Sequence, residues 1–151
     1  MWNQSKSYFQ LIDVFVQERF AMGEPTKSEH GAKVWYVADG WMPLRHEARD
    51  AGLEGHEAIM ILNCHDIDAE IMMDVYFENR DPIEDVPLRV AARRIKCFRM
   101  DHPNEIGGVQ IPRLTQYALR FRSNIGIIVQ YGRMDITQPN LAFIGMMGMP
   151  G

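Results

Sequence analysis

The feature that most limits what this chain can fold into is a succession of short apolar runs, which begins near Lys33 and continues to the end of the sequence. In the clearest run, Ala69 to Phe77, one set of alternate positions is entirely apolar, as in a strand that buries one face. Turn-forming Asn, Asp, Gly and Pro residues cluster between the runs. We therefore predict an all-β fold, an antiparallel β-sandwich or barrel of about eight strands with a short N-terminal helix.

The individual strands are predicted from this alternation and from the turn residues that bound each run. Pro87 has no backbone N–H to donate, so its run is expected near a sheet edge. Residues 65–68 are expected to form a hairpin turn. The predicted strands cover residues 33–38, 57–63, 69–77, 86–90, 94–100, 117–122, 125–133 and 140–147.

The first 30 residues have a different character. Apolar side chains recur near helical spacing over residues 5–21, and Ser5 or Ser7 can cap a helix there. An aromatic face of this kind has to bury against the main domain or a second copy of the chain, unless the segment is a loosely held extension. The apolar positions are Tyr8, Leu11, Ile12, Phe15 and Phe20. We expect a helical extension over residues 1–30 and one β-sandwich domain over residues 31–151.

Composition excludes several classes of protein. The chain has 151 residues and a net charge of -4, which argues against a nucleic-acid partner because such proteins usually present a basic face. Cys64 and Cys97 are not in a C-x-x-C spacing, so we expect reduced thiols rather than a disulfide or zinc site. No signal peptide pattern opens the chain, and no apolar run approaches the ~18 residues of a membrane span. We expect a cytoplasmic protein that does not span a membrane.

Polar side chains stand at the ends of two apolar runs. Glu57 and Asn63 flank the first, and Gln130, Arg133 and Asp135 follow the second. Burying such groups without partners costs on the order of 1 to 3 kcal/mol each. Either they pair with one another and close the ends of a sheet, or they face a pocket and pair with a ligand.

Five segments of the chain have a recognisable order and spacing. They are Trp-Tyr-Val-Ala-Asp-Gly-Trp-Met-Pro at 35–43, Gly-His-Glu at 55–57 with Ile-Leu-Asn at 61–63, Val-Ala-Ala-Arg-Arg at 90–94, Ser-Asn-Ile at 123–125, and Val-Gln-Tyr-Gly-Arg-Met-Asp at 129–135. In this order they resemble the sensory rhodopsin transducer family, over residues 31 to 147. The N-terminal helix and residues 44–53 depart from the family pattern.

The resemblance implies a small β-sandwich that assembles as a homotetramer and binds a small molecule, with sugars or related polar metabolites as the proposed ligands. Carboxylates, amides, guanidinium groups and an aromatic face are what sugar recognition requires. Arginine also suits an acidic sugar, because its planar fork binds two oxygens. The candidate ligand-binding residues are Trp35, Glu57, Asn63, Arg93, Arg94, Gln130, Arg133 and Asp135. We expect Glu57, Arg93 or Arg94, Gln130 and Arg133 to converge on one pocket.

Other interpretations stay open. Each charged candidate has about even odds of being a structural ion pair, and Trp35 is favoured as a core residue. A metal site is disfavoured, since Cys64, His65 and Asp66 are consecutive and cannot all face one ion from a regular strand. We expect no cofactor and no enzyme activity. The main alternative is a protein–protein adaptor that docks on a receptor such as a sensory rhodopsin, and the second is a glycoside hydrolase that uses Glu57, with His56 beside it.

Overall fold

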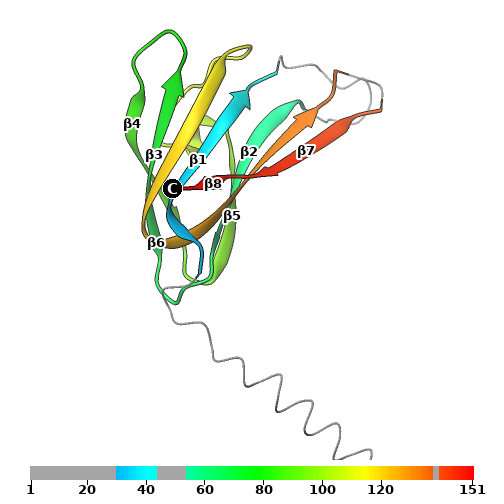
Figure 1. Ribbon diagram of the computed structural model, residues 1–151. Coiled ribbons are helices and arrows are strands. Elements are labelled where there is room, and N and C mark those ends of the chain that lie inside the picture. Colours follow the sequence, from blue (N-terminus) through cyan, green and yellow to red (C-terminus); the bar gives the residue numbers. More distant parts are fainter. Residues whose placement is uncertain (1–29, 44–53, 138–139) are drawn as a thin grey trace, which may run out of the picture.

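The computed structural model describes residues 30–43, 54–137 and 140–151, and this part of the chain consists of β-strands and one short 3-10 helix, Pro103–Glu105. Every strand pairing in it is antiparallel, which confirms the predicted all-β fold (Figure 1). The predicted N-terminal helix lies outside the described residues. The strands are β1 (Ala32–Trp41), β2 (His56–Asn63), β3 (Ala69–Phe77), β4 (Ile83–Val90), β5 (Arg94–Arg99), β6 (Gln116–Asp135), β7 (Ala142–Met147) and β8 (Met149–Pro150).

Two sheets share the long strand β6. The first sheet has the order β4-β3-β6-β1-β8, and the second joins β5, β2, β6 and β7. The first half of β6 pairs with β1 and β3, and the second half pairs with β2 and β7, so the strand runs from one sheet into the other (Figure 1). Gly126 lies at this crossing. A Cβ there would approach the carbonyl oxygen of His30 to 2.3 Å, so only glycine fits.

Two expectations about the strands are wrong. Residues 117–122 and 125–133 are not the two separate strands of the prediction, because they form the single 20-residue strand β6. Residues 65–68 do not close a hairpin between neighbouring strands, because β2 pairs with β5 and β6 while β3 pairs with β4 and β6. This segment instead carries the chain from the second sheet to the first. The prediction that Pro87 marks an edge is confirmed, since β4 is the edge strand of the first sheet.

The core lies between the two sheets and receives alternate side chains from each strand. On β2, Ile59 and Ile61 are buried, and on β3, Ile71 and Met73 are buried. This follows the period-two alternation that the sequence shows.

The residues that the structure describes contain no helix with the length and hydropathy of a membrane span.

Candidate functional site

A fully buried carboxylate, that of Glu57, lies one residue inside the start of β2. Its Oε1 accepts hydrogen bonds from the backbone N–H of Trp41 at 2.9 Å, from Nε of Arg133 at 2.9 Å and from the hydroxyl of Tyr131. Its Oε2 accepts a hydrogen bond from the hydroxyl of Tyr117 at 2.5 Å. Four protein donors therefore surround a group that could not be buried alone.

The pairing of strands creates this cluster. In the register of β2 with β6, Glu57 lies opposite Arg133 and Ile59 lies opposite Tyr131, so all of these side chains point toward the core. Tyr117 comes from the other half of β6, in the first sheet. The cluster therefore links both layers of the sandwich at one end.

Burial and the neighbouring carboxylate change the titration of these groups. Burial, followed by the charge of Glu57 and its hydrogen bond, raises the pKa of Tyr117 well above the ordinary value. Burial and the hydrogen bond to Glu57 likewise raise the pKa of Tyr131. Burial alone would lower the pKa of Arg133, but its hydrogen bond to Glu57, its interactions with Tyr131 and the charge of Glu57 together outweigh burial and raise the pKa. The tyrosines therefore stay neutral and the guanidinium stays charged.

One atom of the cluster is left over. Nη2 of Arg133 is buried and has no hydrogen-bond partner among the residues that the structure describes. A buried N–H group of a charged side chain is costly to leave without an acceptor. A ligand oxygen that accepted a hydrogen bond from this atom would therefore gain binding free energy.

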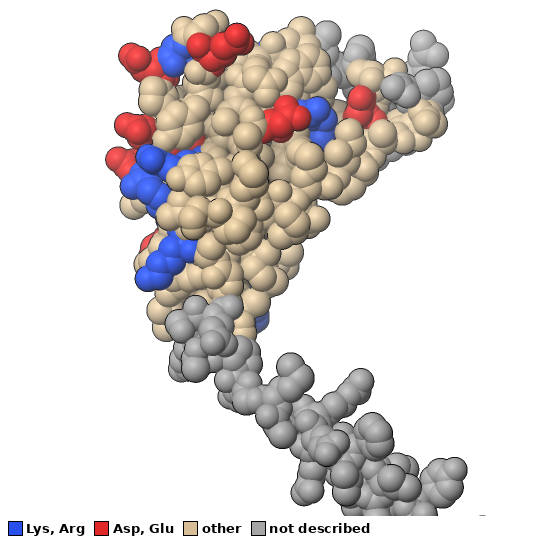
Figure 2. Space-filling model, viewed as in Figure 1, with Lys and Arg blue, Asp and Glu red and all other residues tan. Residues whose placement is uncertain are grey.

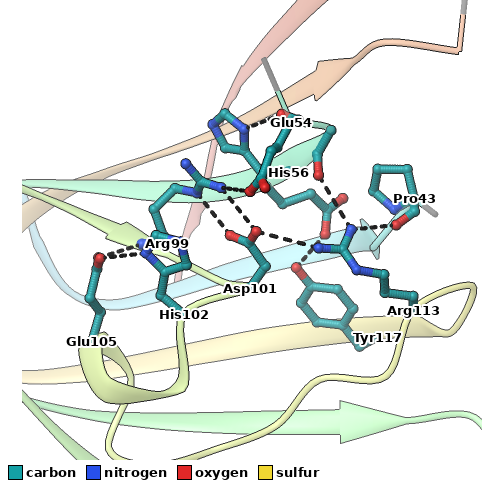
Figure 3. A network of polar contacts seen from close by, with 11 residues as sticks. Pro43, Glu54, His56, Arg99, Asp101, His102, Glu105, Arg113 and Tyr117 are labelled. Atoms are coloured by element: carbon teal, nitrogen blue, oxygen red, sulfur yellow. Dashed lines mark hydrogen bonds and ion pairs between the residues drawn. The ribbon is translucent and has the colours of Figure 1, made fainter. Parts of the chain in front are cut away.

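A second polar network adjoins the first (Figure 3). Asp101 accepts a two-fold hydrogen bond from Arg99, at 2.8 and 2.9 Å, and a longer one from Arg113 at 3.4 Å. Burial alone would raise the pKa of Asp101, but the hydrogen bond and the charge of Arg99, with smaller contributions from His102 and a backbone hydrogen bond, together lower it. Arg113 also donates to the carbonyl oxygens of Pro43 at 2.7 Å and Gly55 at 3.3 Å. It thereby joins the two ends that flank residues 44–53, which lie outside the described residues.

The structure separates the predicted site residues into groups. Asn63 lies at the opposite end of β2 from Glu57, about 20 Å away at ~3.3 Å per residue. Arg94 pairs with Asn63 there, and Arg93 precedes it in a left-handed turn with φ 54°. Of the residues expected to converge, Glu57 and Arg133 lie together, whereas Arg93 and Arg94 lie at the far end of the sheet.

At that far end the polar groups serve the local turns. Nδ2 of the buried Asn63 donates to the carbonyl oxygens of Ile67 at 2.8 Å, Val90 at 3.2 Å and Ala91 at 3.2 Å. Its Oδ1 accepts a hydrogen bond from the backbone N–H of His65 at 2.9 Å. These bonds fasten the connection between the sheets to the end of β4.

The remaining candidates lie in different surroundings. Trp35 is buried in the core, and its indole N–H donates to the carbonyl oxygens of Ala32 and Ile127. Gln130 is three residues from Arg133 and therefore points to the other face of the sheet. Asp135 shares the face of Arg133, and its Oδ1 accepts hydrogen bonds from Thr137.

The outward-pointing side chains of the second sheet form a continuous apolar surface, here called the outer apolar face. Phe143 is 62% exposed, Met147 56% and Ile95 65%. Gln130 is the only side chain with an amide group on this face. The first charged side chain, that of Arg99, lies at the border of the face. The outer apolar face consists of Ala58, Met60, Leu62, Ile95, Cys97, Ile128, Gln130, Gly132, Met134, Phe143, Gly145 and Met147.

The corresponding face of the first sheet is charged. Asp74 accepts hydrogen bonds from Arg120 at 2.6 Å and from Arg122 at 2.9 Å, and Glu70 lies 3.5 Å from Arg89. In Figure 2, blue and red side chains gather on the side where β3 and β4 lie, whereas the surface over β7 is almost entirely tan. The first sheet therefore presents a surface suited to water, and the second does not.

Several of these features were not predicted from the sequence. Tyr117 and Tyr131 fit the alternation of buried strand positions, and nothing local marks their hydroxyls as partners of a carboxylate. Asp101 and Arg113 lie in or beside turns. The apolar run at 142–147 was the available signal for the outer apolar face, but only the register shows which of its residues face outward. Among the described residues, no three His, Cys, Asp or Glu side chains are grouped closely enough to hold a metal ion.

Comparisons with known proteins place this fold in a family. The family model described as Anabaena sensory rhodopsin transducer matches residues 30–150. The crystal structure of Thermotoga maritima 1070 has the same fold, with a TM-score of 0.69 and 23% identity over 80% of this chain and 96% of that chain. The Anabaena sensory rhodopsin transducer gives a TM-score of 0.59 and 32% identity over 70% of this chain and 90% of that chain. No curated protein matches. The chain belongs to the Anabaena sensory rhodopsin transducer family.

Proposed function

We propose that this chain is a non-catalytic adaptor in a sensory pathway, and that it docks on a receptor through the outer apolar face. The family supports a transducer role, because one related structure is that of a sensory rhodopsin transducer. The observation that carries the proposal for this chain is the uncharged, exposed face of the second sheet. The receptor is a sensory rhodopsin or another membrane receptor with an apolar docking segment.

The size of the outer apolar face fits this role. Four strands at ~4.8 Å spacing and six residues at ~3.3 Å each give an area of about 400 Å². A contiguous apolar patch of this size is in the range of the largest patch on a soluble protein, and that patch is often functional. A specific interface buries roughly 800 Å² on each partner, with an apolar centre and a polar rim. The face supplies such a centre, and Arg99 lies at its rim.

Site-specific photo-cross-linking tests the proposal. A photoreactive phenylalanine analogue is placed at Phe143, and in a control variant at Met72, which is 41% exposed on the first sheet. Membrane receptors encoded in the same genome, sensory rhodopsins first, are displayed singly in lipid nanodiscs. We expect one receptor to be captured from position 143 and not from position 72. Equal capture from both positions, or none by any of these receptors, would contradict the proposal.

A second function has a specific observation in its favour. The unpartnered Nη2 of Arg133 suits an oxygen of a sugar acid or related polar metabolite, beside the Glu57 cluster. A ligand at 100 times its Kd would stabilise the fold by about 2.7 kcal/mol. We expect sugar acids to raise the Tm of the wild type but not of Arg133→Met. If sugars and sugar acids leave the wild-type Tm unchanged, this second function fails.

The other finer expectations remain predictions. The homotetramer is tested by light scattering on the purified chain, and the cytoplasmic location by cell fractionation. The glycoside hydrolase reading has less support, because the Glu57 carboxylate is completely buried and already accepts four hydrogen bonds from the protein. It would require turnover of a glycoside that Glu57→Gln abolishes.

A further inference from the structure

The strands at the edges of the two sheets differ in how they are protected against pairing with another chain. An edge strand leaves a row of backbone N–H and C=O groups open, and proteins protect such rows with charges, prolines, bulges or very short strands. Among the described strands, β4 and β8 are the edges of the first sheet, and β5 and β7 are the edges of the second. The first three carry such protection, whereas β7 carries none.

The protection of the first three edges is visible in their residues. β4 contains Pro87 and the charged Asp85, which has a positive φ of 60°, and its register with β3 shifts within the strand. β5 carries the charged side chains of Arg94 and Lys96. β8 is only two residues long, and one of them is Pro150. Each of these features hinders the addition of a further strand.

The edge strand β7 has the opposite character. Its sequence, Ala-Phe-Ile-Gly-Met-Met, contains no charge and no proline, and its register with β6 is continuous. Both of its faces are apolar and exposed, with Phe143 and Met147 on the outer face and Ile144 and Met146 on the other. No described strand other than β6 pairs with it. An apolar and unprotected edge of this kind favours the addition of a strand from another chain.

The backbone of β7 turns alternate residues toward the open edge. The N–H of Gly148 donates to the carbonyl oxygen of Val129 at 3.0 Å, and hydrogen-bonded positions recur at every second residue of an antiparallel ladder. The even-numbered residues of β7 therefore direct their N–H and C=O groups at β6, and the odd-numbered residues direct theirs at the open edge. The odd-numbered residues are Phe143, Gly145 and Met147.

We propose that two copies of this chain pair through β7, antiparallel and around a two-fold axis at Gly145, so that their outer apolar faces form one continuous docking surface. In this register Gly145 lies opposite Gly145 of the second copy, and Phe143 lies opposite Met147 of the second copy. Each of these pairs exchanges both of its backbone hydrogen bonds, since all three residues direct these groups at the open edge. On the other face Ile144 lies opposite Met146 of the second copy, so apolar side chains meet on both sides of the sheet.

Gly145 supports this position of the axis. Its φ is not in the left-handed region, and a Cβ added to it would meet its nearest atom, Nε2 of Gln130, at an ordinary contact distance of 3.6 Å. The fold of the single chain therefore does not require glycine at this position. A glycine inside a strand often marks the close approach of another backbone, and a two-fold axis here brings the two Gly145 Cα atoms to about 5.5 Å from each other.

The joined faces reach the size of a specific interface. One outer apolar face covers about 400 Å², which is half of the roughly 800 Å² that each partner buries in a stable complex. Two faces joined edge to edge supply the whole area. This consequence rests on the proposed function, because the receptor then docks on a surface that two copies form together. The pairing itself is measured on the purified chain without a receptor, so its failure is distinct from a failure of the adaptor proposal.

Two charge variants test the register. In the like-charge variant, Phe143→Lys/Met147→Lys, each introduced lysine lies opposite a lysine of the second copy, which is destabilising. In the opposite-charge variant, Phe143→Lys/Met147→Glu, each lysine lies opposite a glutamate. Both variants change the same two side chains of the outer apolar face, so they differ in the pairing between the copies.

Sedimentation equilibrium measures the mass of each assembly. We expect the wild type and the opposite-charge variant to have at least twice the mass of one copy, which is 17.4 kDa. The like-charge variant should have half of the wild-type mass.

Amide hydrogen exchange, read residue by residue by fragmentation mass spectrometry, locates the contact. The N–H of Gly145 should exchange at least about tenfold faster in the like-charge variant than in the opposite-charge variant, because it loses its acceptor on the second copy. The N–H of Ile144 is directed at β6 and should exchange equally slowly in both, which shows that β7 stays folded. In the wild type, which needs no substitution, dilution to the monomer should accelerate exchange at Gly145 and not at Ile144.

Four outcomes would overturn the inference. A monomeric wild type, or a like-charge variant that keeps the wild-type mass, would show that these edges do not pair. Equal dissociation of both variants would mean that copies meet through their sheet faces rather than through β7. A Gly145 N–H that stays protected in the wild-type monomer would mean that the same chain covers the edge.

Discussion

The substitution Glu57→Gln tests how much the buried cluster contributes to stability. Glutamine keeps the shape of the side chain, and its amide nitrogen can replace Oε2, where the Tyr117 hydroxyl can rotate to accept a hydrogen bond. Its remaining oxygen can still accept from Trp41, Tyr131 and Arg133. The principal loss is therefore electrostatic, because the Arg133 guanidinium is left without its counter-charge.

The size of this loss follows from burial. Removing one partner of a buried ion pair typically costs about 3 to 5 kcal/mol. The Glu57 side chain is fully buried, but that of Arg133 retains 20% exposure and some hydration, so we expect the lower end, about 3 kcal/mol. With an m-value near 2 kcal/mol/M, the urea midpoint should fall by about 1.5 M.

Urea unfolding followed by circular dichroism measures the change. Glu70→Gln is the matched control, since its carboxylate is 62% exposed and lies 3.5 Å from Arg89, and it should cost less than about 0.5 kcal/mol. In a double-mutant cycle, Glu57→Gln with Arg133→Met should cost clearly less than the sum of the two single variants. A loss below about 1 kcal/mol for Glu57→Gln, or additive effects in the cycle, would refute the reasoning.

Three further predictions concern other polar groups. Because burial and Glu57 raise the pKa of Tyr117 and Tyr131, stability that is present below the ordinary value of 10.0 is lost at higher pH, and both tyrosines should ionise only as the fold opens. A spectrophotometric titration checks this, and Tyr131→Phe should remove one late ionisation. Burial alone would raise the pKa of Asp74, but hydrogen bonds from Arg122, Asp85 and Arg120 lower it below 3.8, so its contribution is present above that pH and lost in acid. Asp74→Asn should therefore flatten the acid limb of a stability–pH curve, and an unchanged limb would count against it. Asn63→Ala should cost about 2 to 4 kcal/mol in urea unfolding, because three buried or partly buried carbonyl oxygens and one N–H lose a hydrogen-bond partner, whereas Asn124→Ala at an exposed site should cost under about 1 kcal/mol.

The local alternation of side chains predicts much of this fold. β3 spans the predicted residues 69–77, and β2 and β5 differ from prediction by one residue at one end. Pro87 predicts an edge strand because this single residue has no backbone N–H to donate to a neighbouring strand. Features with a local physical cause were therefore accessible from the sequence.

The candidate site depends instead on pairings between distant residues. Glu57 and Arg133 meet because β2 and β6 pair in one particular register, over a separation of 76 residues. The same register puts Gln130 on the outer face of the second sheet, and the pairing of β2 with β5 puts Arg94 at the end of β2 that is far from Glu57. No local sequence pattern predicts these positions. Asn124 resembles a turn residue, yet in the structure its side chain bonds to Glu70 and Asp68 of the neighbouring chain segment, and β6 continues through it.

The passage of β6 through both sheets fixes its length. Because side chains alternate with a period of two, deleting one residue near Gly126 would leave the first sheet unchanged and turn the second half of the strand inside out. Tyr131 and Arg133 would then face water, and Gln130 and Met134 would enter the core. Insertions and deletions are thus tolerable in the connections around this strand, whereas a one-residue insertion or deletion at its midpoint would separate the buried cluster from the sheet that holds it.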